Sequence, residues 1–140
     1  MEKDIYLYLE GKVADVMSRN PVTVNKRESL EHLIDMFKAH NFHGYPVTDD
    51  DGHLVGIVRD TDILSIFARR DPGSVSLRVV EDVMQRPPLV IDQGETVQKA
   101  IMKMFKDQTR FLAATGEGGR VEGVVTRTDL IRGIHVRRLD

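Results

Sequence analysis

Residues 15–24 read DVMSRNPVTV, and the same pattern returns at residues 82–91 as DVMQRPPLVI. The register continues without a gap, so that GIVRDTD at 56–62 is matched by GVVTRTD at 123–129. An ungapped match of this length indicates an internal repeat, which has to be recognised before a fold is assigned. Two copies that each lack a full core are expected to bury their apolar faces on each other, around a pseudo-two-fold axis with two related clefts.

The length of the chain limits how the repeat is organised. At 140 residues the chain has the size of one ordinary domain. One copy alone, with about 55 residues, lies near the lower limit for independent folding. We therefore expect one compact unit with an N-terminal extension at 1–11, a first repeat at 12–68, a linker at 69–77 and a second repeat at 78–140. The apolar run 5–9 is expected to pack on the other half or on a partner chain.

The composition is that of an ordinary globular protein, and it excludes several classes of function. The net charge is −2, so the chain lacks the strong positive charge that is typical of proteins that bind nucleic acids. The chain has no cysteine, which excludes disulfides and thiolate metal sites and fits a reducing cytoplasm. No apolar run approaches the roughly 20 residues that span a bilayer, and no secretory pattern opens the sequence. These features predict a cytoplasmic protein without membrane insertion.

Apolar periodicity and turn residues predict the same elements in each copy. In the first copy they are a helical turn at 12–17, a strand at 22–24, a helix that Ser29 caps and that ends near His40, strands at 45–48 and 54–58, and a helix capped by Thr61 or Asp62. In the second copy they are a strand at 89–91, a helix capped by Thr96, strands at 111–115 and 121–125, and a helix that starts at Asp129. The repeat unit is therefore β-α-β-β-α, and the fold class is α+β. The basic residues between Arg132 and Arg138 are expected to form a solvated helix end.

Patterns for metal binding and catalysis are weak. DDDG at 49–52 hints at calcium, but the loop lacks the alternating ligands and the final glutamate of a calcium loop. His40 and His43 alone do not complete a zinc site. Because no nucleophile with an activating base is visible either, we expect neither an enzyme nor a catalytic cofactor.

With these features, the chain resembles the cystathionine-β-synthase-type (CBS) domain pair, also called a Bateman module. Three motifs carry the resemblance: the two openings at 15–24 and 82–91, the strand GYPV at 44–47, and the paired segments GIVRDTDIL at 56–64 and GVVTRTDLI at 123–131. The resemblance implies two repeats packed sheet to sheet, usually in a disc-shaped homodimer. It also implies an adenosine-containing ligand in the clefts, most often AMP, ADP or ATP and sometimes S-adenosylmethionine or NAD. The chain is expected to be a stand-alone module.

In the family, the ribose is held by an aspartate that opens the last helix, with a hydroxyl residue three positions earlier. In this chain that pattern is complete in Thr126, Arg127, Thr128 and Asp129. A carboxylate can accept hydrogen bonds from both vicinal ribose hydroxyls, and such charge-assisted bonds are strong. The N–H groups of the helix N-terminus suit phosphate, and Arg127 is a further phosphate candidate. Helix capping alone is the simpler role for Asp129, and it is compatible with ribose binding.

The first copy departs from this pattern at the candidate ligand residues. Arg59 replaces the hydroxyl residue, and Asp60 adds negative charge where phosphate is expected. Two roles are open for Arg59, which either contacts phosphates or fills the cleft by bonding to Asp62. Thr61 completes this second candidate set. We expect unequal sites, of which the Asp129 site is the better one.

The resemblance also implies contacts for the other parts of the ligand. His43 and Arg110 occupy equivalent positions just before strands, where contact with phosphate is plausible. Four residues lie where the family holds adenine through backbone hydrogen bonds and apolar contact: Thr23, Val24, Val90 and Ile91.

Two functions are consistent with these residues. The first is a regulatory sensor that binds an adenosine nucleotide between the repeats, changes the angle between the halves and modulates an unidentified partner protein. The second is a structural assembly module with vestigial ligand sites, an alternative motivated by Arg59, by Asp60 and by Ala113, which stands where the first copy has Pro46. In both, the apolar helices at 30–37 and 97–104 are the expected surface of a homodimer.

Overall fold

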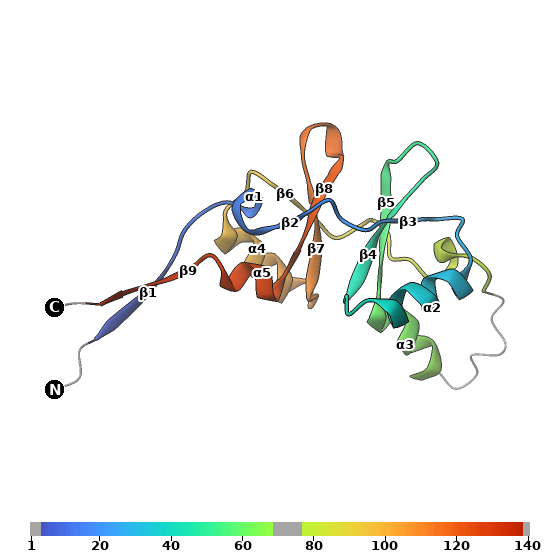
Figure 1. Cartoon of the computed structure of the whole chain (residues 1–140), viewed down its shortest axis with the longest axis horizontal. Coiled ribbons are helices and arrows are strands. Elements are labelled where there is room, and N and C mark those ends of the chain that lie inside the picture. The colour runs from blue at the N-terminus through green and yellow to red at the C-terminus, as the bar shows by residue number, and fades with distance from the viewer. Residues whose placement is uncertain (1–3, 69–76, 139–140) are drawn as a thin grey trace.

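The computed structural model describes residues 4–68 and 77–138, and Figure 1 shows the order of the elements. The first copy and its extension contain β1 (Ile5–Leu9), α1 (Val13–Val16), β2 (Ser18–Arg19), β3 (Val24–Asn25), α2 (Leu30–Ala39), β4 (Gly44–Thr48), β5 (Leu54–Arg59) and α3 (Asp60–Ala68). The second copy contains a 3₁₀ helix (Val80–Asp82), β6 (Val90–Asp92), α4 (Val97–Lys106), β7 (Phe111–Thr115), another 3₁₀ helix (Glu117–Gly119), β8 (Val121–Thr126), α5 (Arg127–Ile131) and β9 (Ile134–Arg138). The predicted linker at 69–77 lies outside the described residues apart from Leu77.

Each copy builds a sheet with the same strand order. In the first copy, β4 pairs in parallel with β3 and antiparallel with β5. In the second copy, β7 pairs in parallel with β6 and antiparallel with β8. Figure 1 shows the hairpins β4–β5 and β7–β8 standing next to each other, with helices α2 to α5 toward their lower ends in that view. The predicted β-α-β-β-α unit is therefore confirmed in both copies.

The opening segment of each copy pairs with the other half of the molecule. β2 runs antiparallel to β8, so that Ser18 lies opposite Val124. The equivalent bridge on the other side joins Gln85 to Ile57. The apolar side chains of these segments are buried in the opposite core: Val13, Val16 and Met17 in the second half, and Val80 in the first. Neither half keeps its whole core within its own repeat, so the two halves are interlocked. We call these two opening segments, residues 13–19 and 80–86, the exchanged segments.

Two equivalent glycines allow this close approach. A Cβ atom on Gly123 would lie 2.6 Å from the carbonyl oxygen of Ser18 and 2.9 Å from the Sδ atom of Met17. A Cβ atom on Gly56 would lie 2.8 Å from the Sδ atom of Met84. A side chain at either position would push the exchanged segment away from its sheet.

The two sheets meet through a small core of their own. Ile57 from β5 packs there with Phe111 and Ala113 from β7, and all three are buried. Half-buried apolar residues on both sides surround this cluster. The prediction of an α+β fold with two repeats packed sheet to sheet is therefore confirmed.

Both predicted caps of the long helices are confirmed. The Oγ atom of Ser29 accepts a hydrogen bond of 3.1 Å from the backbone N–H of His32 at the start of α2. The Oγ1 atom of Thr96 accepts one of 3.2 Å from the N–H of Lys99 at the start of α4. Each bond satisfies one of the free donors of a helix N-terminus.

The last helix of each copy starts earlier than predicted. α3 begins before Thr61 and Asp62, so neither residue is its N-cap. α5 begins before Asp129, and Thr126 is its N-cap. The prediction was wrong because each aspartate lies inside the first turn of its helix instead of at the N-cap. From there its carboxylate accepts the backbone N–H of the residue that precedes the helix.

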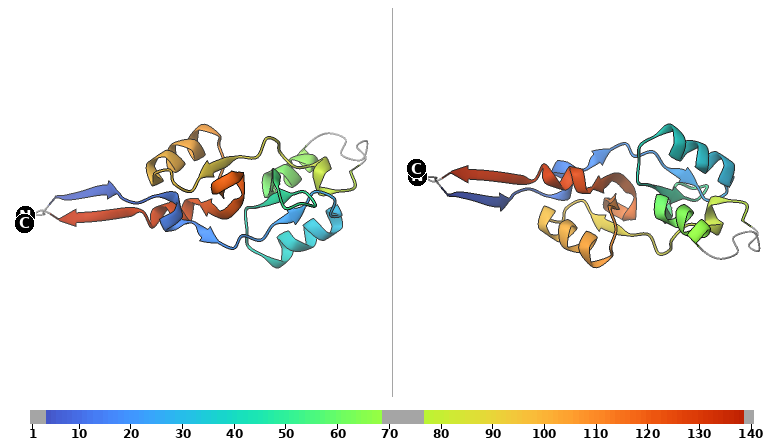
Figure 2. Two further views of the ribbon diagram at one scale, coloured as in Figure 1. Left: turned by 90° about the horizontal axis from the view of Figure 1, so that it is seen from above. Right: turned by 90° about the horizontal axis from the view of Figure 1, so that it is seen from below.

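The C-terminal segment is a strand, which corrects the prediction of a solvated helix end. β9 pairs antiparallel with β1, from Ile5 opposite Arg138 to Leu9 opposite Ile134. Figures 1 and 2 show this two-stranded ribbon extending away from the rest of the molecule. The side chain of Tyr8 stacks on that of His135, with 5.4 Å between ring centroids. The N-terminal extension thus pairs with the second repeat, while its side chains stay exposed.

The apolar stripes of α2 and α4 face inward and belong to the two cores of the single chain, so a dimer surface on these helices stays a prediction. Leu33 on α2 and Val97, Ala100 and Met104 on α4 are buried in the two cores. The large apolar side chains that α3, α4 and α5 expose are different ones: Leu64, Phe67, Met102, Phe105 and Ile131. None of the described helices combines the length and apolar character needed to cross a bilayer. The cytoplasmic location stays a prediction.

Candidate functional site

A cavity of 680 Å³ lies between the exchanged segment of the first copy and the second copy. Its lining comes from three parts of the chain: residues 18–22, residues 41–44, and residues 110–111, 124 and 126–129. The three parts belong to the segment around β2, the loop before β4, and the ends of β7, β8 and α5. Six of the residues predicted from the sequence are brought together here: His43, Arg110, Thr126, Arg127, Thr128 and Asp129.

Asp129 is the buried acidic group of this cavity, with only 4% of its surface exposed. Its Oδ2 atom accepts the backbone N–H of Thr126 at 2.9 Å and the hydroxyl of the same residue at 3.1 Å. Its Oδ1 atom accepts the hydroxyl of Ser18 at 3.3 Å and the Nη1 group of Arg132 at 3.2 Å. Because Ser18 comes from the other repeat, this carboxylate links the two halves of the molecule.

The four donors around Asp129 are not equally fixed. A carboxylate offers about four lone-pair sites, so these bonds use its full capacity. The two bonds from Thr126 belong to the helix cap, whereas the Ser18 bond is long and the Arg132 side chain is 64% exposed. Two hydroxyls of a ligand can replace the Ser18 and Arg132 donors without disturbing the cap. Asp129 is therefore suited to bind a vicinal diol.

A second cavity of 330 Å³ adjoins the first one. The two cavities share His43, Arg110, Phe111 and Arg127 in their linings. The rest of the smaller lining comes from the start of α3 (59–61) and from the end of α4 and the loop after it (104–105 and 108–109). Four basic side chains thus face the smaller cavity, together with the carboxylate of Asp60.

In the first copy, the aspartate equivalent to Asp129 is already occupied. The Oδ2 atom of Asp62 accepts the backbone N–H of Arg59 at 2.7 Å and its Nε–H at 3.3 Å. The Nη2 group of Arg59 donates to the Oδ1 atom at 3.2 Å. Only 20% and 17% of the two side chains are exposed, so the pair is largely shielded from water. Of the two roles left open by the sequence, Arg59 bonds to Asp62, and Asp62 lines neither cavity.

The exchanged segment differs between the two sites as well. Ser18, which reaches Asp129 in the second copy, is replaced by Gln85 at the equivalent position. The Oε1 atom of Gln85 is buried and has no hydrogen-bond partner among the described residues. At the positions equivalent to the lining of the larger cavity, the first copy thus has the bulkier Gln85 in place of Ser18. It also has Arg59, paired with Asp62, in place of Thr126.

The residues predicted to hold adenine are not brought to either cavity. Val24 and Ile91 are 3% and 8% exposed and belong to the two cores, and Thr23 and Val90 also lie outside both linings. β3 starts two residues later than predicted, so the lining is formed by 20–22 instead. The sequence signal for this shift was the Asn20-Pro21 turn, where Asn20 adopts a φ of 55°.

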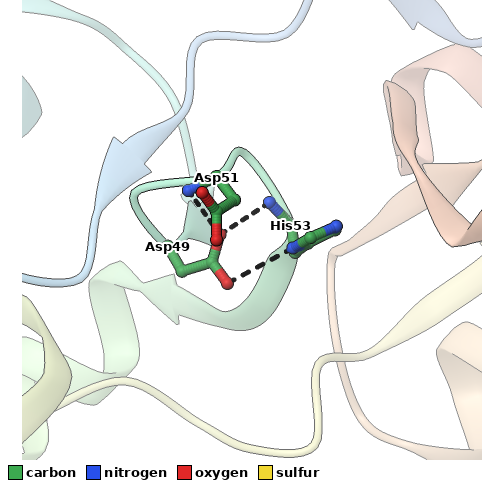
Figure 3. Close-up of side chains that lie close together, drawn as sticks. All are labelled: Asp49, Asp51 and His53. Atoms are coloured by element: carbon green, nitrogen blue, oxygen red, sulfur yellow. Dashed lines mark hydrogen bonds and ion pairs between the residues drawn. The ribbon is translucent and has the colours of Figure 1, made fainter.

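Figure 3 shows a cluster of Asp49, Asp51 and His53 in the β4–β5 turn. The Oδ1 atom of Asp49 accepts the backbone N–H groups of Asp51 at 3.0 Å and of His53 at 2.9 Å. The hydrogen bond from His53 is the main cause that lowers the pKa of the Asp49 carboxyl. These contacts are those of a turn-forming aspartate, and we assign no ligand to the cluster.

The comparisons with known proteins agree with this arrangement. The CBS domain family model matches residues 13–69 and 80–136. The chain is 29% identical over 129 residues to a CBS domain-containing protein of Dictyostelium discoideum, covering 85% of this chain and 88% of that protein. It is also 29% identical over 128 residues to a zinc metalloprotease of Methanocaldococcus jannaschii, covering 91% of this chain. The chain spans only 33% of the length of that metalloprotease.

Two solved structures share the fold and contain bound molecules. CBSX2 of Arabidopsis thaliana, in a complex with AMP, has 25% identity and a TM-score of 0.78, covering 88% of this chain and 95% of that one. The CBS domain pair of protein MJ0100, in a complex with 5′-methylthioadenosine and S-adenosyl-L-methionine, has 27% identity and a TM-score of 0.76. That likeness covers 87% of this chain and 94% of the other.

Proposed function

The chain belongs to the CBS domain family, and from this premise we propose that it is a regulatory module that binds an adenosine nucleotide in its 680 Å³ cavity. The bound nucleotide would modulate a partner protein that is not identified. The observation that carries the proposal is the buried carboxylate of Asp129, which faces a cavity lined by both repeats.

The chemistry of the cavity matches the parts of an adenosine nucleotide. Asp129 has two exchangeable donors that a ribose diol can replace. Arg110 and Arg127 supply cations for phosphate, because guanidinium groups pair well with phosphate oxygens, and His43 lines the same cavity. Pro21 and Val22 offer apolar contact for a base. The related structures with bound AMP and 5′-methylthioadenosine support adenosine as the recognised group.

Regulation follows from the position of the cavity between interlocked halves. A ligand shifts a conformational equilibrium only by its differential affinity for the two states. A nucleotide that contacts both the exchanged segment of the first copy and α5 of the second favours one angle between them. We propose no reaction at this site.

Calorimetric titration of the purified protein with AMP, ADP, ATP, S-adenosylmethionine and NAD tests this function. We expect saturable binding of an adenosine nucleotide, and its loss in Asp129→Ala. Asp35→Ala, on the exposed face of α2, is a matched control that keeps binding. Failure of every one of these ligands to bind would contradict the proposal.

We also propose that the module forms a homodimer through the exposed apolar side chains of α3, α4 and α5. These are the largest apolar groups that the helices leave outside the two cores. Sedimentation at micromolar concentration tests this interface, with Phe67→Glu expected to shift the protein to monomers. A wild-type protein that sediments as a monomer contradicts it.

The ion pair between Arg59 and Asp62 favours a second candidate function. A module with one closed site fits a structural assembly role in which ligand binding is vestigial. That function predicts that Asp129→Ala keeps its partner and its oligomeric state. Loss of the partner complex in a folded Asp129→Ala variant would exclude it.

A further inference from the structure

We propose that the aliphatic face of the β1–β9 ribbon packs against the same face of a second copy of the chain, and that this contact orients the homodimer head to head. The inference rests on the homodimer of the proposed function and not on its ligand. Figures 1 and 2 show the ribbon extending away from the rest of the described chain.

The side chains of the ribbon separate into two unlike faces. Successive residues of a strand point to opposite faces, and residues paired across an antiparallel ladder share a face. The register places Leu7 opposite Val136 and Tyr6 opposite Arg137. Apart from Arg138 at its end, one face is therefore aliphatic: Ile5, Leu7, Leu9, Ile134 and Val136. The other face consists of Tyr6, Tyr8, His135 and Arg137.

The tyrosine face is suited to contact with water. Tyr8 stacks on His135, and the guanidinium of Arg137 lies 5.7 Å from the ring centroid of Tyr8. The Nε2 atom of His135 lies 3.7 Å from the Oε2 atom of Glu10. Phenol, imidazole and guanidinium groups cover apolar surface while they keep their polar atoms in water.

The aliphatic face, in contrast, needs a cover. Ile5, Leu7 and Val136 are 51%, 67% and 55% exposed, so the described parts of the chain leave this face open to water. A two-stranded ribbon alone is only marginally stable and is normally held by packing of an apolar face. A contiguous aliphatic patch of this kind marks an interaction site.

A second copy is the occupant that the position of the ribbon favours. α5 ends at Ile131, an exposed residue of the helix surface assigned to the homodimer above, and β9 begins at Ile134. The aliphatic face thus continues the proposed helix surface along the chain. A two-fold interface requires a patch that fits itself, and a face of aliphatic side chains meets that requirement.

The size of the face indicates that it assists the helix surface and does not replace it. Five side chains from each copy bury roughly 800 Å² in total, less than the about 1,200 Å² of a stable interface. The ribbons alone are therefore not expected to hold two copies together. Phe67→Glu on α3, which breaks the helix surface, should also separate the ribbons.

One two-fold axis has to pass through both contacts. An axis that crosses the helix surface and the ribbon face runs outward along the ribbon, so both ribbons point the same way. Leu7 and Val136, at the centre of the face, then lie near their counterparts in the second copy. At the end of the ribbon, Arg138 pairs with Ile5, next to the exposed Asp4, so opposite charges are available where the two ends meet.

Single cysteines test this contact, because the chain has none of its own. Sheets that pack face to face lie about 10 Å apart, a gap that a short bismaleimide spans between two thiols. At micromolar protein concentration we expect Leu7→Cys to be linked mostly into covalent dimers. Tyr6→Cys, on the opposite face of the same strand, is the matched control that stays unlinked. Adding Phe67→Glu to Leu7→Cys should reduce linking to the control level.

Sedimentation measures what the face contributes to the dimer. Leu7→Lys places a charge on the aliphatic face and should weaken dimerisation by about tenfold, whereas Tyr6→Lys should leave it unchanged. Ile5→Cys, near the end of the ribbon, tests the orientation, because it links to itself only when both ribbons point the same way. Circular dichroism checks that the variants are folded.

The outcomes separate the proposals. Equal linking of Leu7→Cys and Tyr6→Cys, or of neither, in a protein that sediments as a dimer contradicts the ribbon contact and leaves the helix surface intact. Linking of Leu7→Cys without Ile5→Cys contradicts the head-to-head orientation. A wild-type protein that sediments as a monomer contradicts the homodimer and the ribbon contact together, while calorimetry tests nucleotide binding separately.

Discussion

The two copies of the repeat place an aspartate at the same position, yet only one of these aspartates faces an open cavity. Asp129 is held by Thr126, Ser18 and Arg132 and lines a space of 680 Å³. Asp62 is held on both oxygens by Arg59 and lines neither of the two cavities described above. We infer that the residue three positions before the aspartate, Thr126 or Arg59, decides whether the carboxylate is available to a ligand.

The first test of this comparison removes each carboxylate in turn. Asp129→Ala should weaken nucleotide binding on the order of 100-fold, because two charge-assisted hydrogen bonds to the ribose are lost. Asp62→Ala should leave binding within about threefold, since its partner Arg59 stays in the smaller cavity. Calorimetry measures both, and circular dichroism checks that both variants are folded. Equal losses in the two variants would refute the inequality of the sites.

A second variant imposes the first-copy arrangement on the second copy. In Thr126→Arg, the new guanidinium is expected to bond to Asp129 as Arg59 bonds to Asp62, and to weaken nucleotide binding by about thirtyfold. Thr126→Ser keeps the hydroxyl cap and should bind like the wild type. If Thr126→Arg binds as tightly as Thr126→Ser, the residue at this position does not control access.

The glycines under the exchanged segments test how similar the two halves are in packing. Gly123→Ala should lower the free energy of unfolding by about 2 kcal/mol, because its Cβ atom meets the backbone oxygen of Ser18. Gly56→Ala should cost about as much, since its Cβ atom would lie 2.9 Å from the backbone oxygen of Gln85 as well as 2.8 Å from the Sδ atom of Met84. Urea unfolding measures both. No loss of stability in Gly123→Ala would contradict the close contact.

The smallest expected effect concerns the residues that face the two aspartates from the exchanged segments. Gln85→Met should raise the free energy of unfolding by about 1 kcal/mol, because it removes a buried oxygen without a partner among the described residues. Ser18→Ala should lower it by about as much, through loss of the bond to Asp129. Thermal or urea unfolding distinguishes the signs, and a destabilised Gln85→Met would mean that the amide is satisfied in solution.

Much of the fold could be predicted because the repeat offers each element twice. β7 has the predicted bounds, and the caps Ser29 and Thr96 are confirmed. The exchange of the opening segments was not predictable from local pattern. Val13 and its counterpart Val80 are equally apolar, so periodicity does not say in which half each is buried.

The differences between prediction and structure arise from long-range contacts and from side-chain placement. β9 was missed because its basic residues resemble a helix end, and its pairing with β1 joins the two ends of the chain. The four residues predicted to hold adenine line neither cavity, because β3 starts after the Asn20-Pro21 turn and Val24 packs in a core, and their role stays a prediction. The role of Arg59 stayed open because the direction of a guanidinium depends on its neighbours in three dimensions.

The stoichiometry of nucleotide binding tests the central claim most directly. Calorimetric titration of the wild-type protein with ATP, at protein concentrations well above the dissociation constant, counts the sites per chain. The inequality of the Asp129 and Asp62 sites predicts one nucleotide per chain. Two equivalent nucleotides per chain would contradict it.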